Sequence, residues 1–213
     1  MAATRVSPVL LLLLTVQLSL LFRLPDSPST LALALAAEPE QQNAKQHRQP
    51  ALLVQSTCNS TSFYDLCIAA LAADPASSTA DVPGLGAIAV SAAANNASGT
   101  AAFLGNASDA AATPQADRAL LRTCAGKYVA ARDALVQARA SLAEQAYDYA
   151  FVHVSAAGEY PAVCRTLFRR RQQQRGASRT AYPAELAKRE EALRRLCTIA
   201  LDIISLLQNQ ETY

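Results

Sequence analysis

Cysteine thiols are the most reactive side chains in this sequence, and they form disulfides in an oxidising compartment. The chain has five of them: Cys58, Cys67, Cys124, Cys164 and Cys197. A turn is expected near Glu144, and Cys124 and Cys164 lie twenty residues on either side of it. If the segments before and after this turn are neighbouring antiparallel helices, Cys124 and Cys164 lie at the same position along the shared helix axis. A bond between them would close a loop of about 40 residues, worth roughly 3 to 4 kcal/mol in the chain-entropy model.

The other three cysteines are assigned by distance, because two Cα atoms have to lie within about 7 Å to form a disulfide. With a turn near Gly176, the residue that faces Cys164 is close to Lys188. Cys197 lies nine residues further along, which is about 13 Å at 1.5 Å per residue. Cys58 and Cys67 are nine residues apart, so a bond between them requires the chain to fold back at residues 59–62, which are polar turn residues. Cys197 is then expected to be a buried, inert thiol, with a reactive or intermolecular thiol as the alternative.

Groups that could catalyse a reaction or hold a metal are scattered along the chain. The histidines are His47 and His153, and no HExxH, GxSxG, P-loop or GxGxxG motif occurs. Candidate catalytic carboxylates are spread singly, at Asp65, Asp133, Glu144, Asp148, Glu159 and Asp202. Neither their spacing nor that of the histidines suits a metal or an acid–base pair. The sequence therefore predicts a protein that is not an enzyme and has no metal or cofactor.

Arginines gather between residues 165 and 179 with no acid among them, at Arg165, Arg169, Arg170, Arg171, Arg175 and Arg179. One interpretation is a solvated helix end, where cations are favourable. The other is a weak contact of Arg169, Arg170 and Arg171 with an anionic polymer or an acidic partner surface. The formal net charge of +2 argues against nucleic acid as the partner, because phosphate binding needs a concentrated basic surface.

The N-terminus indicates secretion. Arg5 precedes an apolar run over residues 9–22, which has the length of a signal-peptide core, and Ala34 and Ala36 stand in the relation that signal peptidase prefers. We expect residues 1–36 to be a signal peptide and residues 37–50 a flexible leader, so that the mature protein is secreted and extracellular, with no membrane contact. A membrane anchor is the alternative.

Secretion gives meaning to three glycosylation sequons, which begin at Asn59, Asn96 and Asn106. Asn59 adjoins Cys58, so a disulfide that closes early would prevent its glycosylation. Asn96 and Asn106 lie in a polar, alanine-rich stretch that is expected to be exposed.

The elements that carry these residues are predicted to be helices, since the chain has 46 alanines and only 7 glycines. Apolar residues recur at helical spacing in four segments, which begin near Asp81, Thr113, Ala146 and Pro183. Asp81 is expected to cap the first of them and Thr113 the second, with Pro114 in the first position of the second helix. In the third, the expected buried face includes Tyr149, Val152 and Val163, and Gly158 and Pro161 should bend or break the helix. We predict an all-α fold: a short hairpin over residues 51–76 before an antiparallel four-helix bundle over residues 81–208.

Several stretches resemble one known family. They are CIAALAADPASSTADVPGL from Cys67, LLRTCAGKYVAARDALVQA from Leu120, VSAAGEYPAVCRTLF from Val154, and the pair Leu196 and Cys197. Together with Cys58 they resemble the plant invertase and pectin methylesterase inhibitor family over residues 51–208, and the segment around Asp74 and Asp81 is most similar to members named as invertase inhibitors. The resemblance implies a helical hairpin before a four-helix bundle, the same two disulfides, and a free fifth cysteine.

The same resemblance implies a function. A secreted inhibitor of this kind would act in the apoplast or cell wall. It would occlude the active-site cleft of a plant cell-wall carbohydrate enzyme as a 1:1 complex, most simply pectin methylesterase. Cell-wall invertase inhibitors of the family carry Pro-Lys-Phe at the start of the third bundle helix, and the matching positions here are Tyr147, Asp148 and Tyr149. An acid in place of the lysine argues against acid invertase, which stays the alternative target. Tyr147, Asp148, Tyr149 and Tyr128 are the predicted partner-binding residues, although Tyr128 lies on the apolar stripe of its helix, which makes a core position its alternative. A non-inhibitory helical glycoprotein that binds pectin or another partner is the third possibility. The resemblance makes anionic pectin the polymer that Arg169, Arg170 and Arg171 would contact weakly.

Overall fold

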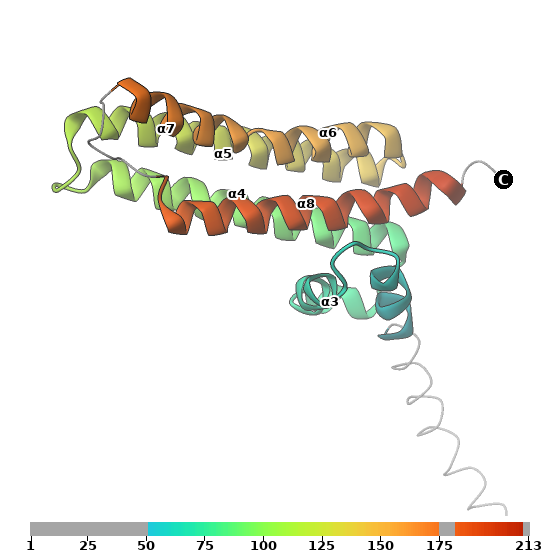
Figure 1. The fold of residues 1–213 in the computed structure, drawn as a ribbon. Helices are drawn as coiled ribbons and strands as arrows, with labels where there is room; N and C mark the ends of the chain where they lie inside the picture. The colour runs from blue at the N-terminus through green and yellow to red at the C-terminus, as the bar shows by residue number, and fades with distance from the viewer. Residues whose placement is uncertain (1–50, 175–181, 211–213) are drawn as a thin grey trace, which may run out of the picture. The chain divides into compact units, whose positions relative to one another are not determined.

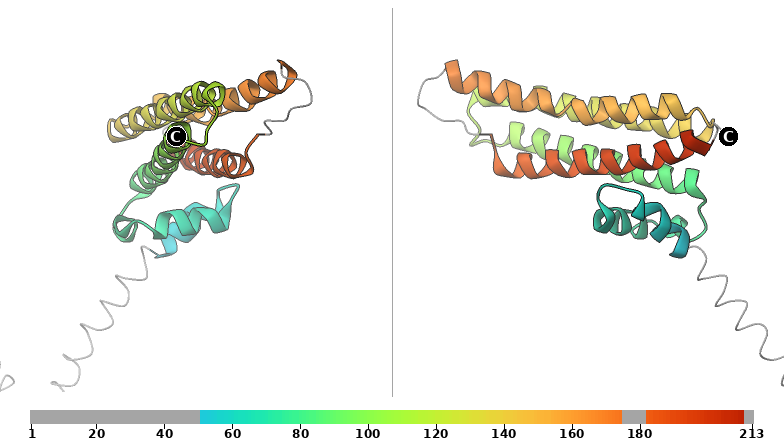
Figure 2. Two further views of the ribbon diagram at one scale, coloured as in Figure 1. Left: turned by 90° about the vertical axis from the view of Figure 1, so that its left-hand side faces the viewer. Right: turned by 45° about the vertical axis from the view of Figure 1, so that its right-hand side comes forward.

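The computed structural model describes residues 51–174 and 182–210, and these form an all-α bundle. Its helices are α4 (Val82–Asp109), α5 (Gln115–Ala143), α6 (Tyr147–Glu159), α7 (Ala162–Gln174) and α8 (Ala184–Gln210). Figures 1 and 2 show α6 and α7 running along α5 in one layer, with α4 beside α8 in the other. The predicted antiparallel four-helix bundle is confirmed, with α6 and α7 together forming its third member. The expected signal peptide and leader lie outside the described residues.

Helix α4 begins as predicted at the Asp81 cap. The Asp81 carboxylate accepts a hydrogen bond from the backbone N–H of Gly84 at 2.9 Å, which satisfies one of the free donors of the first turn. Gly86, which weakens the isolated helix, lies where α4 approaches α8 closely. A Cβ atom added there would lie 3.4 Å from Cγ2 of Ile203. The contact between the two helices therefore compensates for the low helix propensity of this segment.

Helix α5 begins one residue later than predicted. Pro114 has φ −58° and ψ 139°, so it is the cap residue and not the first helical residue. Thr113 does not cap the helix: its hydroxyl donates to the carbonyl oxygen of Ala107 at 2.7 Å. The hydroxyl thus satisfies a carbonyl in the last turn of α4. The predicted cap at Thr113 is wrong, because this hydroxyl bonds to the end of α4 and not to the start of α5.

A tight turn joins α5 to α6 at the predicted place. The backbone N–H of Gln145 donates to the carbonyl of Leu142 at 3.1 Å, and that of Ala146 to the carbonyl of Ser141 at 2.8 Å. This pattern is a Schellman motif, in which the residue after the helix adopts a left-handed conformation. Gln145 has φ 58°, and glycine is the usual residue at this position. The turn sets the direction in which α6 leaves α5.

The third helix breaks where Gly158 and Pro161 predicted it. α6 ends at Glu159 and α7 begins at Ala162, because proline cannot continue the backbone hydrogen bonds. An ion pair then joins α7 to the start of α5: Arg171 Nη2 lies 2.6 Å from Asp117 Oδ1, and both side chains are 17% exposed. This pair and the adjacent side chains of Cys124 and Cys164 fix the same antiparallel register.

The predicted buried face of the third helix is wrong at three positions. Tyr149 and Val152 are 69% and 61% exposed, and Val163 in α7 is exposed as well. The buried side of α6 instead combines two alanines with two larger residues. These are Tyr147, Ala150, Val154 and Ala157. Alanines allow the helices to approach closely, so the larger side chains remain outside. The predicted apolar stripe of the last helix is confirmed, with Leu193, Ile203 and Ile204 fully buried in α8.

The N-terminal hairpin is confirmed. Residues 51–59 are helical, α3 spans Tyr64–Ala72, and a 3₁₀-helix, η1, spans Pro75–Ser78. A disulfide joins Cys58 to Cys67, with their Cα atoms 5.6 Å apart. The turn of the hairpin docks on α8, since Ser62 N–H donates to Asp202 Oδ2 at 2.7 Å and the Arg195 guanidinium lies 5.4 Å from the centre of the Phe63 ring.

The second predicted disulfide is not formed in this structure. Cys124 and Cys164 are buried thiols linked by a hydrogen bond between their side chains. That hydrogen bond and burial raise the pKa of the Cys164 thiol above its ordinary value. The predicted register is therefore correct, because the two side chains meet across α5 and α7, whereas the bond itself stays a prediction.

Cys197 is a buried thiol in α8 that packs toward Gly158 of α6. Burial raises its pKa to about 12, so roughly one molecule in ten thousand carries the reactive thiolate at pH 8. We expect iodoacetamide at pH 8 to leave Cys197 unmodified in the native protein and to alkylate it fully in denaturant, as measured by peptide mass spectrometry. Rapid alkylation of the native protein would show that this part of α8 opens readily.

Candidate binding surface

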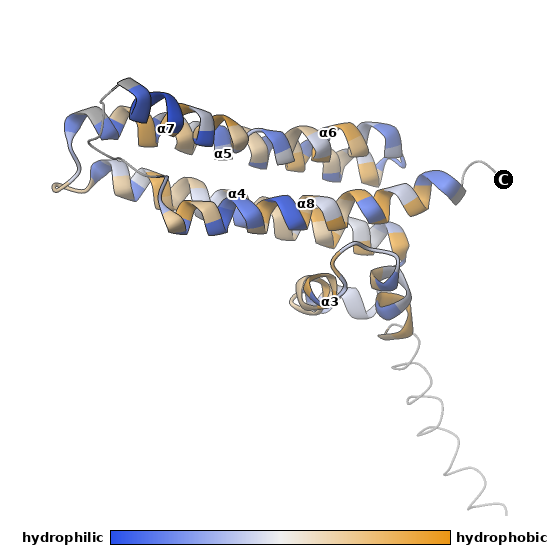
Figure 3. Ribbon diagram, in the orientation of Figure 1, coloured by the Kyte–Doolittle hydropathy of each residue, from blue (hydrophilic) through white to orange (hydrophobic). Residues whose placement is uncertain are grey.

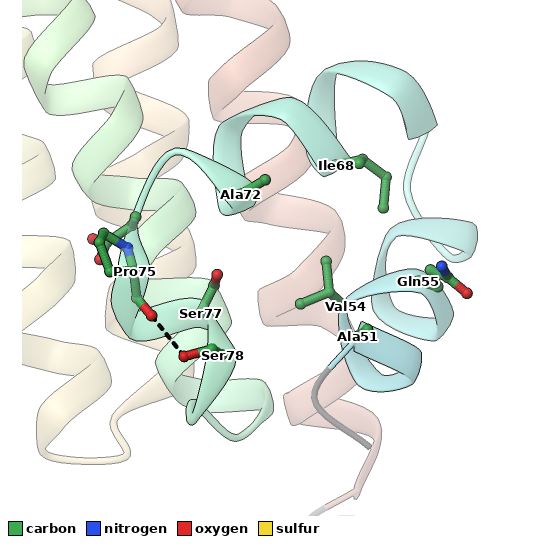
Figure 4. Close-up of a pocket in the computed structure, with 9 residues that line it drawn as sticks. Ala51, Val54, Gln55, Ile68, Ala72, Pro75, Ser77 and Ser78 are labelled. Atoms are coloured by element: carbon green, nitrogen blue, oxygen red, sulfur yellow. Dashed lines mark hydrogen bonds between the residues drawn. The ribbon is translucent and has the colours of Figure 1, made fainter. Parts of the chain in front are cut away.

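Within residues 51–174 and 182–210, no group of three or more His, Cys, Asp or Glu side chains is placed to hold a metal ion. A cavity of about 540 Å³ lies between helical residues 51–59 and the segment formed by α3 and η1 (Figure 4). Its lining is mainly apolar, with Val54, Ile68 and Pro75 among the contributors. The carboxylate in its wall belongs to Asp74, which caps η1 by accepting from Ala76 N–H at 3.0 Å. The cavity therefore brings together no pair of groups for acid–base chemistry.

A more prominent feature is the outer side of α6. Tyr149 and Val152 are three residues apart, so they share one side of the helix, and both extend into solvent. Exposed large apolar side chains that share a side are typical of binding surfaces, where aromatic anchors supply most of the affinity. We call Tyr149 and Val152 the α6 face. Val136, also exposed, lies at about the same height on the neighbouring helix α5.

Asp148 lies in the first turn of α6, beside Tyr149. Its Oδ1 accepts a hydrogen bond from Nε2 of Gln208 at 2.7 Å, which links the start of α6 to the end of α8. A carboxylate at this position is also favoured by the positive end of the helix dipole. The side chain is exposed and can meet a partner. Asp148 thus combines a structural role at the helix start with a negative charge next to the α6 face.

Two of the four predicted partner-binding residues are buried, which contradicts that prediction for them. Tyr147 is 8% exposed and belongs to the inner side of α6, and Tyr128 is 0% exposed in the core side of α5. Burial raises the pKa of Tyr128 above its ordinary value, and its hydroxyl has no hydrogen-bond partner among the described residues. Tyr149 and Asp148 are the predicted residues that reach the surface.

Val136 and Val152 were missed by the sequence interpretation. Apolar periodicity assigns Val152 to the buried side of the helix, because aliphatic residues usually lie on that side. The signal that identifies it as exposed is its phase: Tyr147, Ala150, Val154 and Ala157 follow one another at helical spacing, and Val152 falls on the opposite side. The choice between two apolar sides of α6 depends on which one fits against the neighbouring helices.

The three sequons differ in exposure. Asn59 and Asn106 are exposed, the latter in the last turns of α4. Asn96 is half-buried in the middle of α4, and its Oδ1 is enclosed without a hydrogen-bond partner among the described residues. The expected exposure of Asn96 is therefore wrong. Glycosylation itself stays a prediction, and Asn106 is the sequon best placed for it.

The predicted arginine cluster separates into two kinds of side chain. Arg171 pairs with Asp117 across α5 and α7, so its charge is compensated and its role is structural. Arg169 and Arg170 extend into solvent from α7. Arg175 and Arg179 lie outside the described residues.

In the part of the chain that the structure describes, no helix has both the length and the apolar character needed to cross a membrane. The described helices form a bundle that exposes an aromatic and an aliphatic side chain on one side of α6, a surface suited to binding. The chain belongs to the plant invertase/pectin methylesterase inhibitor family, which its residues 52–203 match.

Its relatives include both kinds of inhibitor in that family. Pectinesterase inhibitor 28 of Oryza sativa subsp. japonica is 60% identical over 166 residues, which cover 75% of this chain and 70% of that protein. Cell wall / vacuolar inhibitor of fructosidase 2 of Arabidopsis thaliana is 39% identical over 155 residues, covering 73% of this chain and 83% of that protein.

The fold also matches a solved structure. A crystal structure of a mutant form of a pectin methylesterase inhibitor from Arabidopsis superimposes with a TM-score of 0.55 at 21% identity. The match covers 70% of this chain and 93% of that one. At this identity the likeness concerns the fold alone.

Proposed function

We propose that residues 51–208 form a secreted, non-catalytic inhibitor of pectin methylesterase that covers the substrate cleft of the enzyme as a 1:1 complex. The chain is a proteinaceous inhibitor of cell-wall enzymes by family, and the 60% identical relative is named a pectinesterase inhibitor. The observation that carries the mechanism is the exposed α6 face, with Tyr149 as its most exposed large apolar side chain. A rigid helix that presents an aromatic anchor loses little conformational entropy on binding.

The occlusion mechanism needs no covalent step. The Schellman turn at Gln145 and the hydrogen bond from Gln208 to Asp148 hold the start of α6 in place. Burial of Tyr149 and Val152 against the rim of a cleft would supply affinity, and the surrounding polar side chains would form the rim of the interface.

The test is direct inhibition with both candidate targets. The purified, secreted protein is mixed with pectin methylesterase and, separately, with acid invertase at apoplastic pH, and residual activity is measured against inhibitor concentration. The proposal expects stoichiometric loss of pectin methylesterase activity and weaker inhibition of invertase. Inhibition of invertase alone would move the assignment to the second target, and inhibition of neither would favour a non-inhibitory binding protein.

Acid invertase remains the second candidate because a 39% identical relative is named an inhibitor of fructosidase. The charge of Asp148 disfavours it, since glycosidase clefts contain a pair of catalytic carboxylates. A like charge opposed to them is repelled most strongly where water is excluded.

We therefore expect Asp148→Lys to strengthen invertase inhibition by about tenfold, or about 1.4 kcal/mol of binding free energy. The substitution leaves Tyr147 untouched, which matters because that ring is buried and a proline in its place would remove core packing. Asp148→Asn is the matched control: it removes the repulsion, keeps an acceptor for Gln208 and adds no attraction, so its gain should be smaller. An unchanged inhibition constant toward invertase for both variants would show that Asp148 does not face the catalytic carboxylates.

A further inference from the structure

Helix α7 is strongly basic. Its thirteen residues include four arginines and no acid. In Figure 3 the labelled α7 segment is predominantly blue, the colour of hydrophilic residues. The formal net charge of the whole chain is only +2, so the positive charge on α7 is a local feature and not part of a general field.

Two of the four arginines are balanced by acids on other helices. Arg171 pairs with Asp117 of α5, and Arg165 Nη2 lies 3.0 Å from Oε1 of Glu190 in α8. Tyr182 donates to the same Glu190 at 2.6 Å and its ring packs edge-on against Phe168 of α7. These contacts fasten α7 to both of its neighbours, so the helix is a rigid platform for the remaining charges.

Arg169 and Arg170 have no acidic partner. Arg169 donates to the hydroxyl oxygen of Thr166 at 3.4 Å, and neither guanidinium forms an ion pair among the described residues. Asp109 pairs with Arg122, and Glu185 pairs with Arg189, so these two acids are engaged by other arginines. Two uncompensated guanidinium groups therefore face solvent from α7.

Arg165 lies beside these two charges on α7, and Glu190 balances its own charge. Although it pairs with Glu190, its side chain is 61% exposed, and it precedes Arg169 by four residues on the same side. The Cα atoms of the two arginines are separated by about one helical turn, roughly 6 Å along the axis. We call Arg165, Arg169 and Arg170 the α7 arginine patch. Guanidinium groups repeated along an axis match an anion with repeated charges better than a single small anion.

We propose that the α7 arginine patch binds the free carboxylates of de-esterified pectin, a linear polyuronate. The inference goes beyond enzyme inhibition, and only the choice of pectin among polyanions rests on the proposed function, because removal of methyl esters creates carboxylates. The patch lies about twenty residues beyond the α6 face, roughly 30 Å along the layer. An inhibitor held in this way would accumulate where the enzyme has already acted, with its α6 face left free.

The experiment is binding of the full secreted protein to immobilised polygalacturonate at low ionic strength, with fully methyl-esterified pectin as the comparison matrix. We expect binding to polygalacturonate that falls steeply with added salt, and little binding to the ester. The double substitution Arg169→Ala/Arg170→Ala should weaken the apparent affinity about three- to tenfold, since each exposed charge contact contributes modestly. Arg132→Ala/Arg139→Ala removes the same charge from α5, outside the patch, and should leave the affinity unchanged.

Three results would overturn the proposal: equal affinity of the wild-type protein and the α7 double variant, equal binding to the methyl-esterified matrix, or tighter binding to anionic phospholipid vesicles than to polygalacturonate. Circular dichroism of each variant verifies that α7 is intact. Inhibition of pectin methylesterase is measured separately on every variant. Full inhibition by a wild-type protein that does not bind polygalacturonate would refute this inference alone, and binding to polygalacturonate without inhibition would refute the proposed function alone.

Discussion

Replacing Tyr149 by alanine is expected to weaken inhibition of pectin methylesterase about 30-fold, which corresponds to about 2 kcal/mol of binding free energy. Tyr149 is 69% exposed on a rigid helix, so the free protein loses almost no packing on truncation. The lost affinity comes from the aromatic surface that the enzyme would bury. The inhibition constant measured at several enzyme concentrations is the readout.

A matched control is available in α3. Tyr64 is also an exposed tyrosine, 41% exposed, but it lies on the hairpin and not on α6. Tyr64→Ala removes the same group, so it should leave the inhibition constant within about twofold, while both variants keep the wild-type melting temperature. Equal losses for the two variants would argue against the α6 face as the contact, and no loss for Tyr149→Ala would remove its assigned anchor.

The second large effect concerns the bundle core. In secreted material we expect a disulfide between Cys124 and Cys164, because their side chains already touch and the secretory pathway supplies disulfide donors. Thiol–disulfide exchange would pass two electrons and two protons to the donor and leave one S–S bond between α5 and α7. Peptide mapping without reduction should recover the two peptides joined, and Cys58 joined to Cys67.

Loss of that bond should destabilise the folded protein. Cys124→Ala/Cys164→Ala is expected to lower the free energy of unfolding by roughly 3 to 4 kcal/mol and the melting temperature by about 10 °C. Cys197→Ala is the control, since it removes a buried thiol that we assign no bond, and its cost should be near 1 kcal/mol. Three free thiols in the secreted protein, or a bond between Cys164 and Cys197, would contradict the prediction.

Local signals made several features predictable. The Asp81 cap, the break between Gly158 and Pro161, and the Cys58–Cys67 hairpin each depend on a few consecutive residues whose backbone preferences act at short range. The apolar stripes of α5 and α8 were equally clear, because large side chains at helical spacing admit one buried side. The facing of Cys124 and Cys164 followed from the turn position and the rise of an α-helix.

The surface that matters for binding was less accessible to sequence reasoning. In α6 both sides carry apolar residues, and the structure buries the side with alanines, which exposes Tyr149 and Val152 while enclosing Tyr147. Tyr128 differs, because it lies on the apolar stripe of α5 and that position by itself predicts burial. Close packing selects the side whose volume fits the space between neighbouring helices, and hydrophobicity alone does not encode that volume.

The sequence by itself determined the helical class, the order of the helices, their antiparallel register and the family, because these depend on propensity, spacing and local motifs. Tertiary structure decided which arginines of α7 are free and which are paired, and which tyrosines reach solvent. Arg171 and Arg169 look alike in the sequence, and only the position of Asp117 on a helix some fifty residues earlier neutralises one of them. Long-range charge pairing and packing between helices therefore decide what this protein presents to a partner.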